Sequence, residues 1–293
     1  MFKNLIGNDK IKKDLELILK NGNIFHSYMF TGTDGIGKKE FAKEFAKGIL
    51  CVDENRPCQK CKSCLEFDGN NNPDFYYIGL EDDNSIKIET IRKMQQKISE
   101  LPIVSKRKVY IIDDFECCTT AAQNCLLKTI EEPPEFVTII LITANESRVL
   151  NTIKSRCLKI NFNNIEDNKL IDFLEKKYDI KNISFNMLKS YNGSIGKAVA
   201  MLEKEELYTN IEKVFDNIEN YNIITAKNKL DILYKEKDEI KDILDYINVI
   251  LINKAKNNIK YIEYVDMVEQ TKRKINSNCN YDMSIDSLLF SIW

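Results

Sequence analysis

This sequence has little histidine, no long apolar run and almost no net charge. Each of these features excludes a class of function. The chain has 293 residues and a single histidine, His26, which excludes a histidine-rich metal site and argues against a Ser-His-Asp hydrolase. Its 43 basic and 45 acidic residues nearly cancel, so no global positive field draws it to nucleic acid. No apolar run approaches the roughly 20 residues of a membrane span, and we expect a cytoplasmic protein.

Glycine and proline are absent from the last part of the chain. The last glycine is Gly196, and the last of the five prolines is Pro134. Downstream, apolar residues recur at the spacing of a helix face, as they do within 240–251. Because neither helix breaker interrupts this pattern, we expect residues from about 164 onward to be helical throughout.

The first 160 residues alternate between two patterns. Short apolar runs typical of buried parallel strands lie at 27–31, 74–78, 108–112, 137–142 and 157–160. Helical periodicity appears between them, at 38–50, 89–100 and 119–131. Strands that alternate with helices predict an α/β fold with a parallel sheet.

A glycine-rich phosphate loop is predicted between the first strand and the helix that follows it. Residues 32–38 fit G-x-x-x-x-G-K, with Gly32, Gly35 and Gly37 allowing backbone N–H groups to surround phosphate oxygens and Lys38 neutralising their charge. The next residue in such loops is Ser or Thr, whose hydroxyl binds Mg²⁺, but here it is Lys39. An ammonium group repels Mg²⁺, so whether the loop binds ATP with magnesium stays open.

An acidic pair after the third apolar run matches the second element of such a site. Asp113 follows a run of apolar residues and is expected to hold Mg²⁺ through water. The next position usually carries a glutamate that polarises the attacking water, and here it is the shorter Asp114. Together with Lys39, this change indicates a retained scaffold with reduced chemistry.

Four of the nine cysteines are closely spaced. Cys51, Cys58, Cys61 and Cys64 lie within 14 residues and favour tetrahedral Zn²⁺, with an iron–sulfur cluster and plain thiols as alternatives. No ligand position is left open, so we expect a structural zinc. The remaining cysteines have no such spacing and are expected to be buried small hydrophobes: Cys117, Cys118, Cys125, Cys157 and Cys279.

Several motifs are shared with one known family. They lie at 26–32, in the phosphate loop, at the four cysteines, and at 72–74, 88–92, 113–134 and 155–157. The run L-L-K-T-I-E-E-P-P at 126–134 beside S-R-C at 155–157 is the most specific of them. On these motifs the chain resembles the delta-prime family of bacterial DNA polymerase III clamp-loader subunits, within the AAA+ proteins. The resemblance is clear over about residues 1–205, and beyond them only helical character and length agree.

The resemblance implies three domains. They are an AAA+ nucleotide-binding-like domain at 1–162 with a zinc module at 51–64, a helical lid at 163–206, and a helical collar at 207–293 that joins a ring of five subunits. The segment G-S-I-G-K-A at 193–198 is similar to the family's lid signature, and it places Lys197 where an arginine that senses the γ-phosphate often stands.

The resemblance also implies a role inside the polymerase holoenzyme. Delta-prime subunits hydrolyse little or no ATP, and Arg156 occupies the position of an arginine that acts in trans on the neighbouring subunit's ATP. The implied partners are the motor (gamma/tau) and delta subunits, the sliding clamp, and primed DNA through the complex. The implied cofactor is structural zinc, with ATP and Mg²⁺ left open.

The sequence is also compatible with two other functions. The first is an active ATPase, either the motor subunit or a related AAA+ enzyme, which a basal ATPase assay separates from the non-motor role. The second is a metal-dependent nucleic-acid-binding module in which Lys60 and Lys62 contact phosphate. The near-neutral charge and the lack of interleaved aromatic and basic residues argue against the second.

Overall fold

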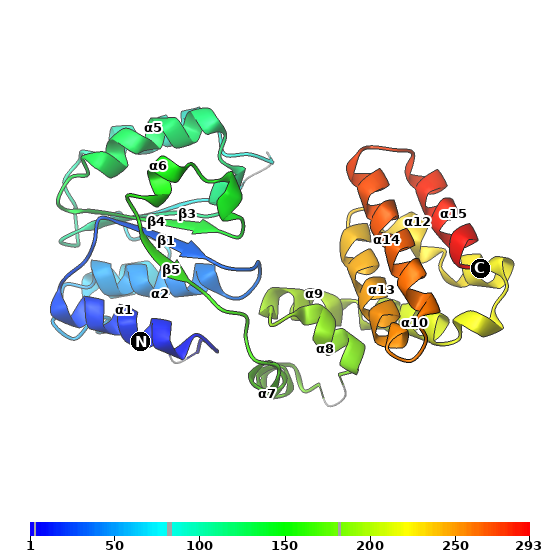
Figure 1. Cartoon of the computed structure of the whole chain (residues 1–293). Helices are drawn as coiled ribbons and strands as arrows, with labels where there is room; N and C mark the ends of the chain where they lie inside the picture. The colour runs from blue at the N-terminus through cyan, green and yellow to red at the C-terminus, as the bar shows by residue number, and fades with distance from the viewer. Residues whose placement is uncertain (3, 81–83, 181–182) are drawn as a thin grey trace. The chain divides into compact units, whose positions relative to one another are not determined.

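A five-stranded parallel sheet forms the centre of the first of two compact units. The computed structural model describes residues 1–2, 4–80, 84–180 and 183–293. The first unit comprises Met1–Phe173 and Gly193–Gly196, and the second comprises Leu174–Asn192 and Lys197–Trp293. The strands are β1 (Ser27–Thr31), β2 (Phe75–Ile78), β3 (Lys108–Ile112), β4 (Val137–Thr143) and β5 (Leu158–Asn161), in the order β2-β3-β4-β1-β5. Every neighbouring pair is parallel, as predicted (Figure 1).

Helices cover both faces of this sheet. On one face lie α1 (Asp9–Asn21) and α2 (Lys38–Leu50), and on the other lie α5 (Thr120–Glu131) and α6 (Asn151–Lys154) (Figure 1). Helix α4 (Ile88–Ile98) packs into the same core as α5 and α6. Successive strand residues point to opposite faces, so Tyr28 and Phe30 of β1 pack with the first set while Met29 packs with the second. The two cores explain why the central strands carry continuous apolar runs.

The edge strands differ from the central ones. Every residue of β1, β3 and β4 is buried, whereas β2 and β5 are partly exposed, and Leu158 of β5 lies open to solvent. Burial on both faces therefore holds for the three central strands only. A strand at the edge has a neighbour on one side alone, and solvent reaches its other side.

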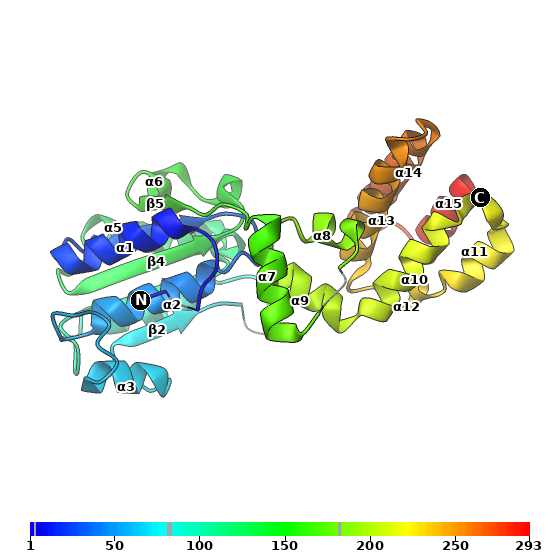
Figure 2. The same cartoon turned by 90° about the horizontal axis from the view of Figure 1, so that it is seen from below.

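The carboxyl ends of the strands meet at one edge of the sheet and place the candidate site there. The phosphate loop follows β1, a 3₁₀ turn η1 (Phe115–Cys117) follows β3, and another, η2 (Glu146–Arg148), follows β4. Beside α2 and β2 lies α3 (Lys62–Asp68), where the rings of Phe67 and Phe75 pack 4.7 Å apart (Figure 2).

The second unit is helical, as the missing glycine and proline predict. Its helices and 3₁₀ turn are the end of α7 (Asp167–Tyr178), α8 (Phe185–Tyr191), most of α9 (Ile195–Glu203), α10 (Glu205–Asp216), η3 (Ile218–Asn220), α11 (Ile223–Lys229), α12 (Ile232–Lys235), α13 (Ile240–Ala255), α14 (Lys260–Asn276) and α15 (Tyr281–Ile292). In the described part of the chain, no helix combines the length and apolar character that crossing a membrane requires.

The expectation for the five cysteines outside the cluster holds in part. Cys118 is buried, and Cys117, Cys125 and Cys157 are partly buried. The prediction is wrong for Cys279, which is exposed because it lies in the connection between α14 and α15 rather than on a packed helix face.

Candidate functional site

The predicted phosphate loop lies between β1 and α2, as its sequence context requires. Gly32, Gly35 and Gly37 all have positive φ, at 149°, 70° and 94°. Residues with side chains rarely adopt these angles, which explains why glycine recurs at this spacing. The loop therefore has the backbone form that its motif predicts.

The polar groups of the loop are bonded to one another. The Lys38 ammonium donates to the carbonyls of Gly32 and Thr33, at 2.9 and 2.8 Å. The Gly35 N–H donates to the Asp34 carboxylate at 2.8 Å. Burial lowers the pKa of Lys38, with the charge of Asp34 opposing that shift. Asp34 thus supplies within the chain a negative charge of the kind that phosphate brings to such loops.

Lys39 reaches the acidic end of β3. Its ammonium lies 3.6 Å from Oδ2 of Asp113 and 4.4 Å from the centre of the Tyr77 ring. The Tyr77 hydroxyl donates to the same Asp113 oxygen at 2.6 Å, while Oδ1 accepts from the Asp114 N–H at 3.0 Å. The carboxylate expected to serve magnesium is therefore engaged by groups of the chain itself.

Asp114 lies in a left-handed backbone conformation beside other acids. Its φ is 48°, which aspartate tolerates better than most residues. Burial raises the pKa of Asp114, and the charges of Asp113, Glu116 and Asp34 raise it further. Glu116 itself accepts from the Ala144 N–H at 2.9 Å and so joins the ends of β3 and β4.

The phosphate loop is also attached to the start of α9. The Gly196 N–H donates to the Gly35 carbonyl at 2.9 Å. A Cβ atom at Gly35 would come 2.3 Å from Oγ of Ser194 and 3.1 Å from Cα of Gly196. The two backbone segments thus approach closely only because both positions are glycine. Within the first unit, this contact ties the loop to the segment that carries the predicted lid signature.

Lys197 is the remaining predicted phosphate-contacting residue. It belongs to the second unit, where its ammonium lies 3.9 Å from Asp242. Its assignment as a phosphate contact stays a prediction.

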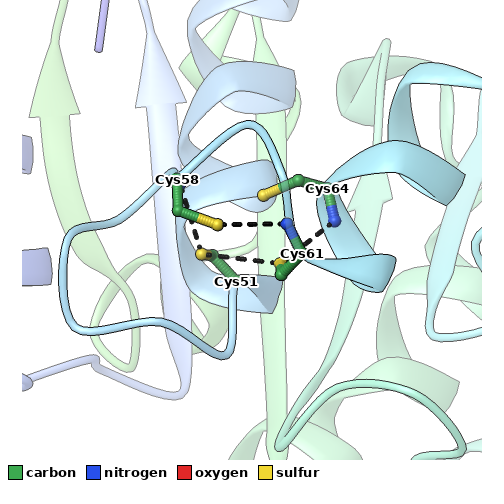
Figure 3. A group of neighbouring side chains, drawn as sticks. All are labelled: Cys51, Cys58, Cys61 and Cys64. Carbon is green, nitrogen blue, oxygen red and sulfur yellow. Dashed lines mark hydrogen bonds between the residues drawn. The ribbon is translucent and has the colours of Figure 1, made fainter.

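The four predicted metal ligands come together in the connection between α2 and α3. The sulfur atoms of Cys51, Cys58, Cys61 and Cys64 all lie within 4.8 Å of one another (Figure 3). Those of Cys51 and Cys61 are 3.9 Å apart, close to the about 3.8 Å edge of a tetrahedron with Zn–S bonds of about 2.3 Å. Four soft donors in this geometry fit Zn²⁺.

The surroundings of the sulfur atoms suit a bound cation. Backbone N–H groups of Cys58, Cys61 and Cys64 point to the sulfurs of Cys51, Cys58 and Cys61, at 3.4, 3.3 and 3.4 Å (Figure 3). The N–H of Lys60 is the main cause that lowers the pKa of Cys58 to about 7, whereas burial raises that of Cys51 and Cys64. A metal ion would stabilise the thiolates that burial disfavours.

The cysteine module is anchored to α2 by a buried lysine. The Lys47 ammonium lies 2.7 Å from a carboxylate oxygen of Asp68 in α3 and also contacts Gln59. The Ser63 hydroxyl donates to the Leu50 carbonyl at 3.0 Å. These contacts hold the module on the sheet domain independently of its sulfur atoms.

Arg156 lies between α6 and the start of β5, whereas this chain's own phosphate loop follows the end of β1. The Nη1 of Arg156 donates to the Thr152 carbonyl at 2.9 Å. Its Nη2 lies 2.9 Å from the Glu131 carboxylate at the end of α5. With 38% of its side chain exposed, the guanidinium is accessible from outside.

The sequence alone does not predict the contacts of Tyr77 and Glu131 or the role of Asp34. Tyr77 stands one residue before the end of β2 and meets Asp113 because β2 and β3 pair in parallel. The sequence offers a weak signal for it, since polar residues at the ends of adjacent parallel strands approach one another. Nothing in the sequence distinguishes Glu131 from its neighbours, because it belongs to the longer motif at 126–134.

Comparison with known proteins points to one family. A family model described as "DNA polymerase III, delta subunit" matches residues 7–166. The tau/gamma subunit of DNA polymerase III from Haemophilus influenzae is 31% identical over 211 residues, which are 69% of this chain and 30% of that protein. The delta' subunit from Bacillus subtilis is 30% identical over 206 residues, 70% of this chain and 62% of that protein. The chain thus spans less than two thirds of each of these relatives.

One solved structure shares the fold over nearly the whole chain. It is a gamma-subunit-related protein of DNA polymerase III from Thermotoga maritima, with a TM-score of 0.51 and 17% identity, covering 95% of this chain and 98% of that one. At this identity the likeness shows the fold alone. It confirms the predicted architecture, an α/β domain with a parallel sheet followed by helices.

Proposed function

The chain belongs to the DNA polymerase III delta-subunit family of clamp-loader proteins, and from this we propose that it is a non-motor, delta-prime-like subunit of the clamp loader. In this role it assembles with motor (gamma/tau) and delta subunits into a five-membered ring. The ring opens the sliding clamp and loads it onto primed DNA. The chain's own contribution is structural, together with one arginine offered to a neighbour.

The observation that carries the non-motor assignment is the contact of Lys39 with Asp113. A hydrolysing member needs Mg²⁺ near this carboxylate to bridge the β- and γ-phosphates. Here an ammonium 3.6 Å away already supplies the positive charge, and no hydroxyl follows Lys38 to ligate a metal ion. The Asp34 bond to the Gly35 N–H adds negative charge where phosphate would have to bind.

Arg156 is proposed to act on the nucleotide of the adjacent motor subunit. A guanidinium is planar and always charged, and it matches phosphate oxygens in a way that lysine does not. It would stabilise the charge that develops on the γ-phosphate during transfer, an effect worth about 10³–10⁵ in rate when complete. Its exposed side chain can reach a partner without any rearrangement of the fold.

The proposal extends to the remaining assignments. We propose that Cys51, Cys58, Cys61 and Cys64 hold a structural zinc, and that residues 163–206 and 207–293 serve as lid and collar. Lys197 is proposed as a reduced remnant of the lid's phosphate-sensing position. ATP binding by this loop is not required for the proposed role.

The test is a reconstituted complex containing motor and delta subunits, clamp and primed DNA. Arg156→Ala should lower DNA- and clamp-stimulated ATP hydrolysis and clamp loading, with folding, zinc content and assembly unchanged. Lys38→Ala is the matched control, since it removes a cation of this chain's own loop and should leave loading largely intact. Unchanged hydrolysis and loading with Arg156→Ala would overturn the trans-acting role.

The alternative function is an ATP-hydrolysing motor, because several relatives are named gamma or tau subunits. The pure chain would then hydrolyse ATP in a magnesium-dependent manner, and Lys38→Ala would abolish that activity. The non-motor proposal expects negligible hydrolysis by the pure chain.

A further inference from the structure

The guanidinium of Arg156 is held by two different helices. Nη1 donates to the Thr152 carbonyl within α6 at 2.9 Å and to the Ser155 hydroxyl at 3.3 Å. Nη2 lies 2.9 Å from Oε1 of Glu131, the last residue of α5. A planar group fixed at two of its nitrogens by separate elements has little freedom to rotate.

The geometry points to Glu131 as a positioning residue for Arg156, a role that rests on the proposed trans action of this arginine. We infer that the Glu131 carboxylate holds one end of the guanidinium so that its exposed edge is presented to the neighbour's phosphate. Glu131 does not touch the nucleotide and acts only through Arg156.

The stability of the fold does not explain why Arg156 and Glu131 form this ion pair. The two side chains are 38% and 46% exposed, and pairs this accessible contribute little to the free energy of folding. The orientation of the guanidinium gives a better explanation. A long flexible side chain loses entropy on binding unless it is already held in place. The fixed contacts of the guanidinium remove that cost in advance for a group that must meet a phosphate in a narrow range of angles.

The experiment uses the full reconstituted complex, with motor subunits whose own trans-acting arginine is changed to alanine. Hydrolysis then reports the site that this chain completes. The variants are Glu131→Ala, Glu131→Gln, Arg156→Ala and the double variant, with Glu132→Ala as control because this neighbouring carboxylate is also exposed. The readouts are kcat and KM for ATP, together with the melting temperature of the isolated chain.

We expect Glu131→Ala to lower kcat by about tenfold with little change in KM, below the about 10²-fold that a 1 Å misplacement can cost. Glu131→Gln should restore most of the rate, since its amide oxygen accepts the same hydrogen bond. Glu132→Ala should match the parent. Adding Glu131→Ala to Arg156→Ala should have no further effect, as expected when two residues act as one unit.

The outcomes separate this inference from the proposed function. If Arg156→Ala leaves the rate unchanged, the proposed trans-acting role of Arg156 falls and the inference falls with it. If Arg156→Ala lowers the rate but Glu131→Ala does not, only the inference falls. An effect of Glu131→Ala that persists in the Arg156→Ala background, or that follows a lowered melting temperature, assigns Glu131 a structural role and overturns it.

Discussion

At the scale of single residues, the end of β3 concentrates negative charge at a partly buried point. The pKa of Asp114 is raised by burial and by the charges of Asp113, Glu116 and Asp34. An acid whose pKa is higher in the folded chain than in the unfolded one binds more protons when folded, so its ionisation at neutral pH lowers stability. The negative charge of Asp114 therefore destabilises the folded chain at neutral pH.

Asp114→Asn should stabilise the chain at pH 7, because it removes a charge that the fold disfavours and asparagine tolerates the same left-handed backbone. The gain should shrink as the pH falls through the raised pKa, where Asp114 is neutral in the parent too. Denaturant unfolding over a pH series measures it. Asp179→Asn is the control, since Asp179 has a similar φ of 54° but is exposed. A gain that is independent of pH would contradict the charge explanation.

Which residues could be foreseen depends on how local their contacts are. Gly32, Gly35 and Gly37 were predictable, because a motif of fixed spacing dictates the backbone they form. Tyr77 and Glu131 were not, since each meets its partner only after separate elements have packed. The error at Cys279 has the same cause, because composition does not show which short connection exposes its side chains.

At the scale of elements, the zinc module is a loop and a short helix attached to a much larger core. We expect about one equivalent of Zn²⁺ in the purified protein, held by the four clustered cysteines. Structural zinc contributes on the order of 10–16 kcal/mol in small fingers, which unfold without it. Here the contacts of Lys47 and the sheet core remain, so chelation should loosen residues 51–72 without unfolding the chain.

Metal analysis and hydrogen exchange test this prediction. Cys64→Ser should lose zinc and raise exchange within the module while the sheet stays protected. Cys279→Ser, at an exposed cysteine outside the cluster, should keep full zinc content. Freshly purified parent protein without zinc would show that the cluster does not serve this purpose.

The strands were predictable to within about a residue because the central three are buried on both faces and read as continuous apolar runs. The short turns η1 and η2 were not foreseen, since single 3₁₀ turns carry little periodicity. The contact between the phosphate loop and Gly196 was also not predictable, because it joins segments far apart in the sequence.

At the scale of the whole molecule, the second unit exposes apolar side chains around the turn between α13 and α14. Ile252, Ile259 and Ile262 are 52%, 79% and 54% exposed. Three exposed apolar side chains this close in the sequence make the turn a candidate interaction surface, and burying each such side chain contributes roughly 1.5–3 kcal/mol. If the collar joins the ring, this turn is a suitable place for a neighbouring subunit.

Ile259→Asp should therefore weaken incorporation into the reconstituted complex, because a charge would be buried at the contact. Size-exclusion chromatography with the motor and delta subunits measures this. Leu17→Asp on α1 is the matched control, since Leu17 is 53% exposed in the first unit. Normal co-elution of the Ile259 variant would place the collar contact elsewhere.

The Lys39 ammonium is covalently part of the chain, so its presence beside Asp113 does not depend on the concentration of any solute. A free metal ion occupies a carboxylate according to its concentration, whereas a tethered group has an effective concentration set by geometry alone. From the contact between Lys39 and Asp113 we expect the charge at the end of β3 not to depend on the supply of magnesium and nucleotide. If the chain assembles with subunits that cycle between nucleotide states, as proposed, we expect it to keep one conformation when ATP is depleted and restored, and so to present those subunits with an unchanging surface.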